Sequence, residues 1–579
     1  MSSVHELLRK STREVSPRLR LVGLTSVVVA ALAACAGGNA TAPADTAPRV
    51  DPQRLFAHIK VLSDDSFEGR SPGSAGEEKT VAYLSEQFRA AGAKPGNPDG
   101  SWVQNVPLVG IRTTPEWRLN GCAADLKLNA PDDYVAWTTQ VQPQVEIKAS
   151  DLVFVGYGVV APEYGWDDYK GLDVKGKTLV MLVNDPAIPD VNNPGQLDNA
   201  MFKGKAMTYY GRWTYKYEIA AAKGAAGAII VHETIPASYP YEVVRNNGVS
   251  ENMTLKPTDG NAGDVPMRSW IREDKARELL KACGQDFDAL KAAALQKSFQ
   301  PVALATQLNA SLQNTLREMT SQNVIARIEG SDPKHKHEHV IYTGHWDHLG
   351  KSVEGEHTHI FNGAVDNASG IAAMLEIARE FARNRKQMKR SVLFLAVTAE
   401  EQGLLGSKFY ADNPLYPLQS TVANLNIDAL QPWGKTKDIQ VIGSGQTTIE
   451  SLVEKHAAAQ GRYMVADQRP ESGGYFRSDH FNLVQKGVPA LFLKGGVEVI
   501  DKPDGYGLQR SKEYGSQHYH KEGDEIKPDW DVSGFAQDAE LYYLIGRDMV
   551  MDLQNVDFQD GSEFKSVRQT LLAKQVIAE

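Results

Sequence analysis

The second half of the chain alternates short apolar runs with amphipathic stretches. Four runs are apolar almost throughout, as expected of strands buried on both faces of a sheet, at residues 340–343, 392–397, 422–427 and 490–493. Residues 370–383 place Ile371, Met374 and Leu375 on one face of a helix between the first two runs. From about residue 323 this pattern predicts an α/β fold, with a doubly wound, mostly parallel sheet and helices on both faces.

Residues 51–119 begin with two helical patterns, one carrying Leu55, Ile59 and Leu62 and the other following a glycine-rich loop. We expect this segment to complete the main domain formed by residues 295–579. The loop contains a G-x-S-x-G match centred on Ser71. A nucleophile elbow needs a buried strand before the serine and a helix directly after it, whereas here a helix precedes and Pro72 follows. Ser71 is therefore not expected to be a nucleophile.

Residues 120–294 have a different sequence pattern, with short β-rich runs separated by turns. We expect an inserted domain there. The pattern predicts strands at 151–160, 177–183 and 228–231 and a helix at 217–223. His232 and Glu233 begin an H-E-x-x-H pattern, but its fifth position is Pro236. The helical motif that binds a single zinc ion is therefore absent from this stretch.

The first 34 residues have the features of a signal peptide: basic residues lead into an apolar run that is too short to span a bilayer. The run ends in Leu-Ala-Ala-Cys, which resembles a bacterial lipoprotein cleavage box with Cys35 as the lipidated residue. An ordinary signal peptide cut near Ala34 remains the alternative. Residues 35–50 then predict a flexible tether. Both interpretations predict export, to the periplasm or to a membrane through a lipid on Cys35.

The amino-acid composition further limits the classes of protein and partner that fit this chain. The chain has 579 residues, 42% apolar and 23% charged, which is typical of a globular protein of two or more domains. Its formal charge of −10 argues against a nucleic-acid partner. Besides Cys35 there are only Cys122 and Cys283, which either form a disulfide in an oxidising compartment or remain free. They cannot make a zinc site by themselves.

Polar side chains follow the predicted strands at the points where these end. His345, Asp347 and His348 follow the first strand, Glu400 and Glu401 the second, and Asp428 the third, while Asp366 precedes the helix at 370–383. In open α/β sheets the ligand lies beyond the carboxyl ends of the strands. Carboxylates gathered there would raise one another's pKa unless cations neutralise them. A pair of divalent metal ions would do so.

These stretches resemble peptidase family M28. The resemblance rests on Gly344–His348, Gly363–Gly370, Ala399–Gly403, Asn426–Asp428, Ser478–His480 and Tyr519–His520, which occur in family order. The inserted block resembles a protease-associated (PA) domain, notably at residues 154–158 and 225–229.

The resemblance implies a metallopeptidase with two divalent ions, zinc being expected, although these ligands also accept Mn or Co. It implies that Asp366 bridges both ions, with His345 and Asp428 completing one site and Glu401 and His520 the other. Glu400 would be the general base, Tyr519 the oxyanion donor, and Asp347 the partner that fixes the ring of His345. The expected activity is release of N-terminal residues from short peptides. A carboxypeptidase or dipeptidase, a cyclising acyltransferase, and an inactive receptor-like relative remain alternatives.

Other polar residues have plainer interpretations. We expect His335, His337 and His339, which precede a predicted strand among lysines, to be solvated, and likewise His357 and His359. Asp479 and His480 match the family pattern and are expected to support the site without binding metal. Asp524 either buttresses the loop that carries His520 or lies on the surface.

Overall fold

The computed structural model describes residues 50–578 of the chain, so the predicted signal peptide, Cys35 and nearly all of the tether lie outside the described residues. Among the described residues, no helix has the length and apolar character needed to cross a membrane. Export and lipidation therefore stay predictions from the sequence.

The core of the second half is a sheet whose adjacent strands β19, β16, β12 and β15 run parallel to one another. These are the four predicted strands, at His339–His345 (β12), Ser391–Val397 (β15), Thr421–Asn426 (β16) and Ala490–Gly495 (β19). The sheet continues past β19 through antiparallel β17 (Asp438–Val441) to β18 (Tyr463–Ala466). The predicted doubly wound, mostly parallel α/β class is confirmed.

Alternate residues of β12 and β15 serve two different cores. Val340, Tyr342 and Phe394 pack into one cluster, whereas Ile341 and Leu393 pack into another. Because successive side chains of a strand point to opposite faces, both faces of this sheet are covered. The runs read as continuously apolar for this reason.

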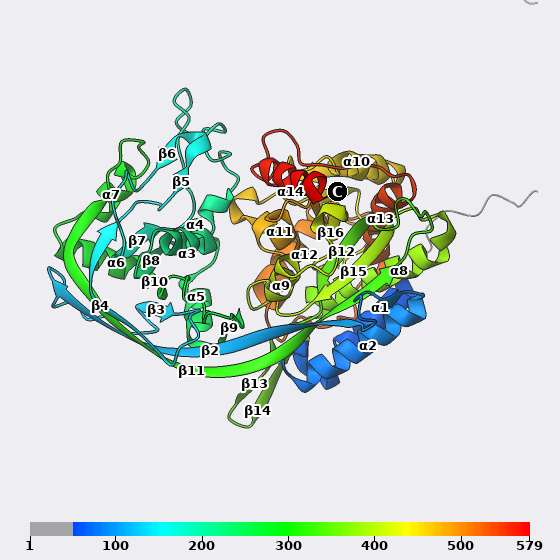
Figure 1. The fold of residues 1–579 in the computed structure, drawn as a ribbon, viewed down its shortest axis with the longest axis horizontal. Coiled ribbons are helices and arrows are strands. Elements are labelled where there is room, and N and C mark those ends of the chain that lie inside the picture. The colour runs from blue at the N-terminus through cyan, green and yellow to red at the C-terminus, as the bar shows by residue number, and fades with distance from the viewer. Residues whose placement is uncertain (1–49, 579) are drawn as a thin grey trace, which may run out of the picture. The chain divides into compact units, whose positions relative to one another are not determined.

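Helices supply the two covering layers (Figure 1). The face of the first cluster carries α1 (Pro52–Leu62), α2 (Ala75–Ala91), α8 (Gly370–Arg383), α10 (Glu450–Ala459) and α13 (Ser533–Met551). The opposite face carries α9 (Leu405–Asp412), α11 (His480–Val484) and α14 (Lys565–Ala578). Asp51 caps α1 by accepting hydrogen bonds from the backbone of Gln53 and Arg54, and Gly92, at φ 98°, ends α2 in the left-handed conformation.

Ser71 lies where the sequence analysis expected, outside any strand–turn–helix elbow. It follows a short helical segment, Asp65–Arg70, and precedes α2.

Two long antiparallel strands, β2 (Val103–Gly121) and β11 (Val302–Ile328), lead out to a second region and back (Figure 1). There β4 (Gln144–Phe154), β7 (Thr178–Leu182), β8 (Gly227–His232) and β10 (Met267–Arg272) run parallel, with β3 (Tyr134–Trp137) antiparallel at the edge. β9 (Asn252–Leu255) pairs with β2. The helices of this region are α3 (Trp213–Ala222), α4 (Thr234–Ala237), α5 (Tyr241–Val249), α6 (Glu273–Ala282) and α7 (Phe287–Ala293).

The second region has apolar clusters of its own, separate from the two that cover β12 and β15. The strands predicted at 177–183 and 228–231 and the helix predicted at 217–223 are present as β7, β8 and α3. The run at 151–160 is divided between β4 and the short strand Val160–Ala161. That this region is a PA domain stays a prediction.

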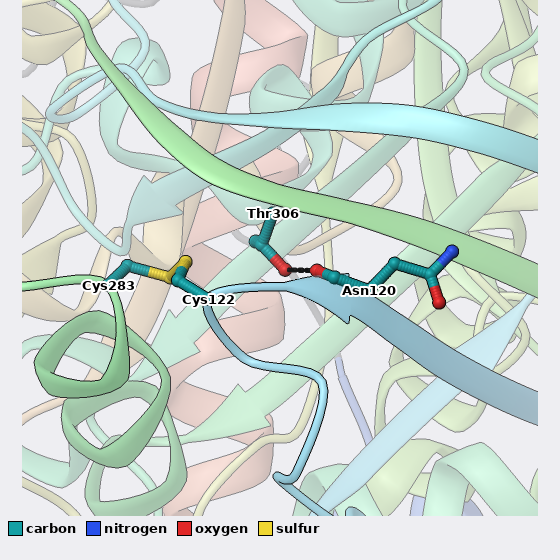
Figure 2. The surroundings of a disulfide bond; sticks show 4 residues. All are labelled: Asn120, Cys122, Cys283 and Thr306. Atoms are coloured by element: carbon teal, nitrogen blue, oxygen red, sulfur yellow. Dashed lines mark hydrogen bonds between the residues drawn. A yellow bond between two sulfur atoms is a disulfide. The ribbon is translucent and has the colours of Figure 1, made fainter.

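Cys122 and Cys283 form a disulfide that joins the outer end of β2 to the end of α6 (Figure 2). Their Cα atoms are 5.0 Å apart although 161 positions separate them in the sequence. Next to the bond, the hydroxyl of Thr306 on β11 donates to the carbonyl of Asn120 on β2 (Figure 2). The disulfide was one of two alternatives that the sequence left open.

One of the three histidines at the start of β12 differs from the expectation that all three are solvated. His337 is exposed and His335 forms an ion pair with Glu338, but His339 is the first residue of β12 and only 1% exposed. Its ring lies against that of Tyr416, with centroids 4.5 Å apart. The prediction of a solvated His339 is wrong, because the strand begins one residue earlier than the apolar run.

Candidate metal centre

The carboxyl ends of β15, β12 and β16 lie side by side, because β12 pairs in parallel with both neighbours. His345 is the last residue of β12. Glu400 and Glu401 follow β15 after a two-residue turn, and Asp428 follows β16. The strand edge thus brings together the side chains that the sequence analysis predicted to meet there.

Asp366 lies between two imidazole–carboxylate groups. Its Oδ1 is 3.1 Å from His345 Nε2, and that same nitrogen is 3.6 Å from Asp428 Oδ1. Its Oδ2 is 3.4 Å from His520 Nε2, which is 3.0 Å from Glu401 Oε2. Each oxygen of one carboxylate therefore faces a different group.

These separations fit metal coordination. Ligand atoms bound tetrahedrally at about 2.0–2.2 Å lie about 3.4 Å from one another. The nitrogen and oxygen atoms of His345, Asp366 and Asp428 are close enough together to hold an ion. So are those of Asp366, Glu401 and a third residue, His348.

His348 is a site residue to which the sequence analysis gave no role. It is buried, and its Nδ1 lies 2.7 Å from Glu401 Oε1. His520 also contacts Glu401, but through the other oxygen, and its Nε2 reaches Asp366 as well. Because one nitrogen of His520 contacts both carboxylates, His520 is the better placed of the two histidines to bind a metal, and His348 is placed to orient Glu401.

The electrostatics of the site favour bound positive charge. Burial lowers the pKa of His345, but the carboxylates of Glu400, Asp366 and Asp428 outweigh it and hold that pKa well above its usual value. His520 behaves in the same way, through Glu401 and Asp366. Carboxylates crowded in this manner are stabilised by cations.

Asp347 is buried beneath the Glu400–Glu401 turn. Its carboxylate accepts hydrogen bonds from the backbone of Glu400 (3.1 Å) and Glu401 (3.4 Å), and burial raises its pKa to about 8. It contacts the ring of His345 through its backbone oxygen, 3.1 Å from Nδ1, whereas the nearest carboxylate oxygen is 3.8 Å away. Asp347 thus orients the ring, but through its main chain, because its carboxylate is occupied by the turn.

Asp524 ties the loop of His520 to the turn that carries Asp366. It is 1% exposed, and its carboxylate accepts hydrogen bonds from the backbone of Val365 and Asp366, each at 3.0 Å. The hydroxyl of Tyr514 donates to the same carboxylate at 3.1 Å. Asp524 therefore buttresses the loop that carries His520 and does not lie on the surface.

Asp479 and His480 are buried close to these side chains. Asp479 accepts a hydrogen bond from Ser407 at 2.6 Å, and burial raises its pKa to about 7. His480 packs between Tyr475 and Phe492, and burial lowers its pKa to about 3. Neighbouring Ser478 donates to Asp428 at 2.6 Å.

Arg70 is a second residue whose importance the sequence did not reveal. Its buried guanidinium donates to the carbonyls of Trp346 (2.8 Å) and Gly363 (2.9 Å), which flank His345 and begin the Asp366 turn. It also donates to Leu62 and Asn362, each at 2.6 Å. One side chain thus holds the two loops of the site together.

Tyr519 and His520 lie on the solvent side of the site. Tyr519 is 46% exposed, and its ring stacks on that of His520, with centroids 3.9 Å apart. Partial burial raises the pKa of Tyr519 well above its usual value, and the carboxylates of Asp366 and Glu401 raise it further. The hydroxyl is therefore a neutral hydrogen-bond donor.

The chain is similar to known peptidases in sequence. Residues 323–544 match the model of peptidase family M28. The chain is 29% identical over 235 residues to a probable leucine aminopeptidase 2 of Aspergillus fumigatus, which covers 38% of this chain and 42% of that protein. It is 30% identical over 221 residues to leucine aminopeptidase 2 of Trichophyton rubrum, covering 36% and 40%. The chain thus spans less than half the length of these curated relatives.

Among solved structures, an aminopeptidase from Aneurinibacillus sp. strain AM-1 aligns over 87% of this chain and 94% of its own, with a TM-score of 0.47 and 20% identity. A zinc aminopeptidase from Bacillus subtilis aligns over 88% and 98%, with a TM-score of 0.42 and 20% identity.

Proposed function

Because residues 323–544 match the model of peptidase family M28, we propose that this chain is a metallo-aminopeptidase that releases N-terminal residues from short peptides. The observation that carries the proposal is the position of Asp366, whose two oxygens face the pair His345 and Asp428 on one side and the pair Glu401 and His520 on the other. A carboxylate so placed suits two ions a few ångströms apart.

His345, Asp366 and Asp428 would hold one ion, and Asp366, Glu401 and His520 the other. Zinc is the first choice, since imidazole and carboxylate ligands at these spacings suit it. When bound, the ions would polarise the scissile carbonyl and make water a stronger acid.

Glu400 is the proposed general base. Burial raises its pKa, His345 opposes that rise, and the carboxylates of Glu401 and Asp428 add to it, so that the pKa is well above its usual value. A carboxylate with a raised pKa is a better proton acceptor near neutral pH. Glu400 takes a proton from the water whose oxygen bonds to the peptide carbon, and gives it to the amine nitrogen as the C–N bond breaks.

Tyr519 is the proposed oxyanion donor. Its hydroxyl would donate a hydrogen bond to the carbonyl oxygen as negative charge develops there, which is worth most if the donor is fixed in place. Stacking on His520 restricts the ring of Tyr519.

The test separates the base from the metal ligands. Glu400→Gln should keep the fold and both metals while lowering turnover by roughly 10²–10⁴-fold, the typical contribution of general acid–base catalysis. Glu401→Gln should lose affinity for one metal, and added metal should restore part of its activity. Metal stoichiometry and turnover are measured on the same samples. Full activity in both variants would remove the basis of the assignment.

The substrate class is tested with matched peptides. Short peptides with a free N-terminus should be hydrolysed, and the same peptides with an acetylated N-terminus should not. Equal rates on both, or release from the C-terminus, would favour the carboxypeptidase alternative, and hydrolysis confined to dipeptides would favour the dipeptidase.

A further inference from the structure

A second group of metal-binding side chains lies outside the centre described above. The hairpin of β13 (Gly350–Glu354) and β14 (His357–Phe361) stands apart from the large sheet (Figure 1). His357 and His359 are two residues apart on β14, so their side chains share one face of the strand. Their ring centroids are 4.2 Å apart.

The third member comes from a different segment. Glu522 belongs to the loop that also carries His520, and its Oε2 is 2.9 Å from His359 Nδ1. One ligand atom from each of His357, His359 and Glu522 lies within 4.8 Å of the others.

We propose that His357, His359 and Glu522 bind a zinc-type divalent cation at a peripheral site, separate from the catalytic pair. Two imidazoles and one carboxylate form a donor set that zinc prefers, and water can complete the coordination of an exposed site. The ligands are accessible to an ion from solvent: His357 is exposed, and the side chains of His359 and Glu522 are 25% and 47% exposed.

The plainer interpretation is a surface hydrogen bond between His359 and Glu522. That pair alone does not account for His357, whose ring stands edge-on to that of His359 within the same cluster. A cation would use all three side chains. The expected solvation of both histidines is met only in part, since His359 is half-buried against Glu522.

A bound cation would connect two segments that support the catalytic centre. The base of the hairpin is anchored on the Asp65–Arg70 segment, where Lys351 Nζ lies 2.9 Å from Glu68. Glu522 lies between His520, a proposed ligand, and Asp524, the buttress of the Asp366 turn. The peripheral cation would therefore restrict the loop that positions His520.

The experiment compares zinc binding by the full chain with that of a His357→Ala/His359→Ala variant. In equilibrium dialysis against zinc chloride, the double variant should bind one equivalent fewer than wild type, and Glu522→Gln should bind that equivalent more weakly. Loss of a direct ligand should cost more than the roughly 10–100-fold that removal of an outer-shell partner costs. His337→Ala, which removes an exposed histidine outside the cluster, is the matched control and should bind as wild type does.

Hydrogen exchange provides a second readout. Zinc should slow backbone hydrogen exchange in residues 518–524 more in wild type than in the double variant. Equal stoichiometry in wild type and double variant would overturn the proposal, even if exchange changed. Because the result is a difference of one equivalent measured without substrate, it does not depend on whether the peptidase proposal is correct.

Discussion

At the scale of single residues, two histidines contact Glu401, and His520 is the one proposed as a ligand. His520→Ala should lower the metal stoichiometry of the catalytic centre by one, because its Nε2 faces both Asp366 and Glu401. His348→Ala should keep both metals but weaken one by roughly 10–100-fold, as removal of a residue that orients a ligand typically does. Metal titration monitored by competition with a chelator measures both effects. If His348→Ala lost a whole equivalent and His520→Ala did not, the two assignments would have to be exchanged.

His339 makes stability depend on pH. Burial lowers its pKa from 6.5 to about 3, and both ring nitrogens lie without a hydrogen-bond partner among the described residues. Between these values the unfolded chain binds a proton that the folded chain does not, so the free energy of unfolding falls as pH falls from about 6.5 towards 3. One such group contributes at most about 1.4 kcal/mol per pH unit.

His339→Phe keeps a ring against Tyr416 and removes this proton. Its free energy of unfolding should therefore fall less steeply than that of wild type between pH 6.5 and pH 4, a window set by the pKa of His339. Urea unfolding at several pH values measures the two slopes. Parallel pH profiles would show that His339 is not the titrating group.

The site residues that the apolar pattern alone indicated are those tied to a strand end, whereas Asp366, Tyr519 and His520 were implied by the family resemblance. His345, Glu400 and Asp428 each follow an apolar run, and the topology of a parallel sheet requires such positions to meet. His348 also follows the first predicted strand but was given no role, whereas Arg70 had no comparable signal. Arg70 donates to the carbonyls of Trp346, 276 positions away, and of Gly363, and contacts of that separation leave no local pattern in the sequence.

At the scale of elements, Arg70 connects the end of α1 to the two loops of the site. Arg70→Met should lower the free energy of unfolding by roughly 3 kcal/mol or more, because several buried carbonyls would lose their donor and each costs about 1–3 kcal/mol. Metal affinity should fall with it, since the loops of His345 and Asp366 are no longer held together.

The matched control is Arg89→Met on α2. Arg89 forms an exposed pair with Glu86, and such pairs contribute at most about 1 kcal/mol. Urea unfolding and metal titration of both variants give the comparison. If Arg70→Met were as stable as Arg89→Met, the bonds of Arg70 to the loops would not support the site.

Elements buried on both faces were predicted well, and elements that cross between regions were not. β12, β15, β16 and β19 have continuous apolar runs and were found to within a few residues. β2 and β11 alternate buried and exposed positions over long stretches, and the predicted inserted block, 120–294, begins inside β2 and ends before β11. The change in sequence pattern located the second region, but it did not locate β2 and β11, the two strands that connect this region to the main sheet.

At the scale of the whole molecule, the Cys122–Cys283 bond closes a loop of the second region. The double variant Cys122→Ala/Cys283→Ala should be less stable by about 2–5 kcal/mol, the usual effect of removing a native disulfide. The expected mechanism is greater freedom of the unfolded chain, so metal stoichiometry should not change. Urea unfolding measures the loss, and wild type treated with a reductant should behave like the variant. An unchanged midpoint in both would contradict the prediction.

The path of β2 and β11 determines where the second region is attached to the main sheet. The chain leaves the main sheet at Val103 and returns at Val324, and these two residues are paired partners on adjacent strands. Everything between them is therefore an extension of one hairpin, whose strands separate only beyond the Gly121–Thr306 pair. Residues can be gained or lost at the far end of such a hairpin without changing the order of the strands that carry His345, Glu400 and Asp428. A change in the size of the second region would thus leave the sheet that positions the candidate metal centre intact.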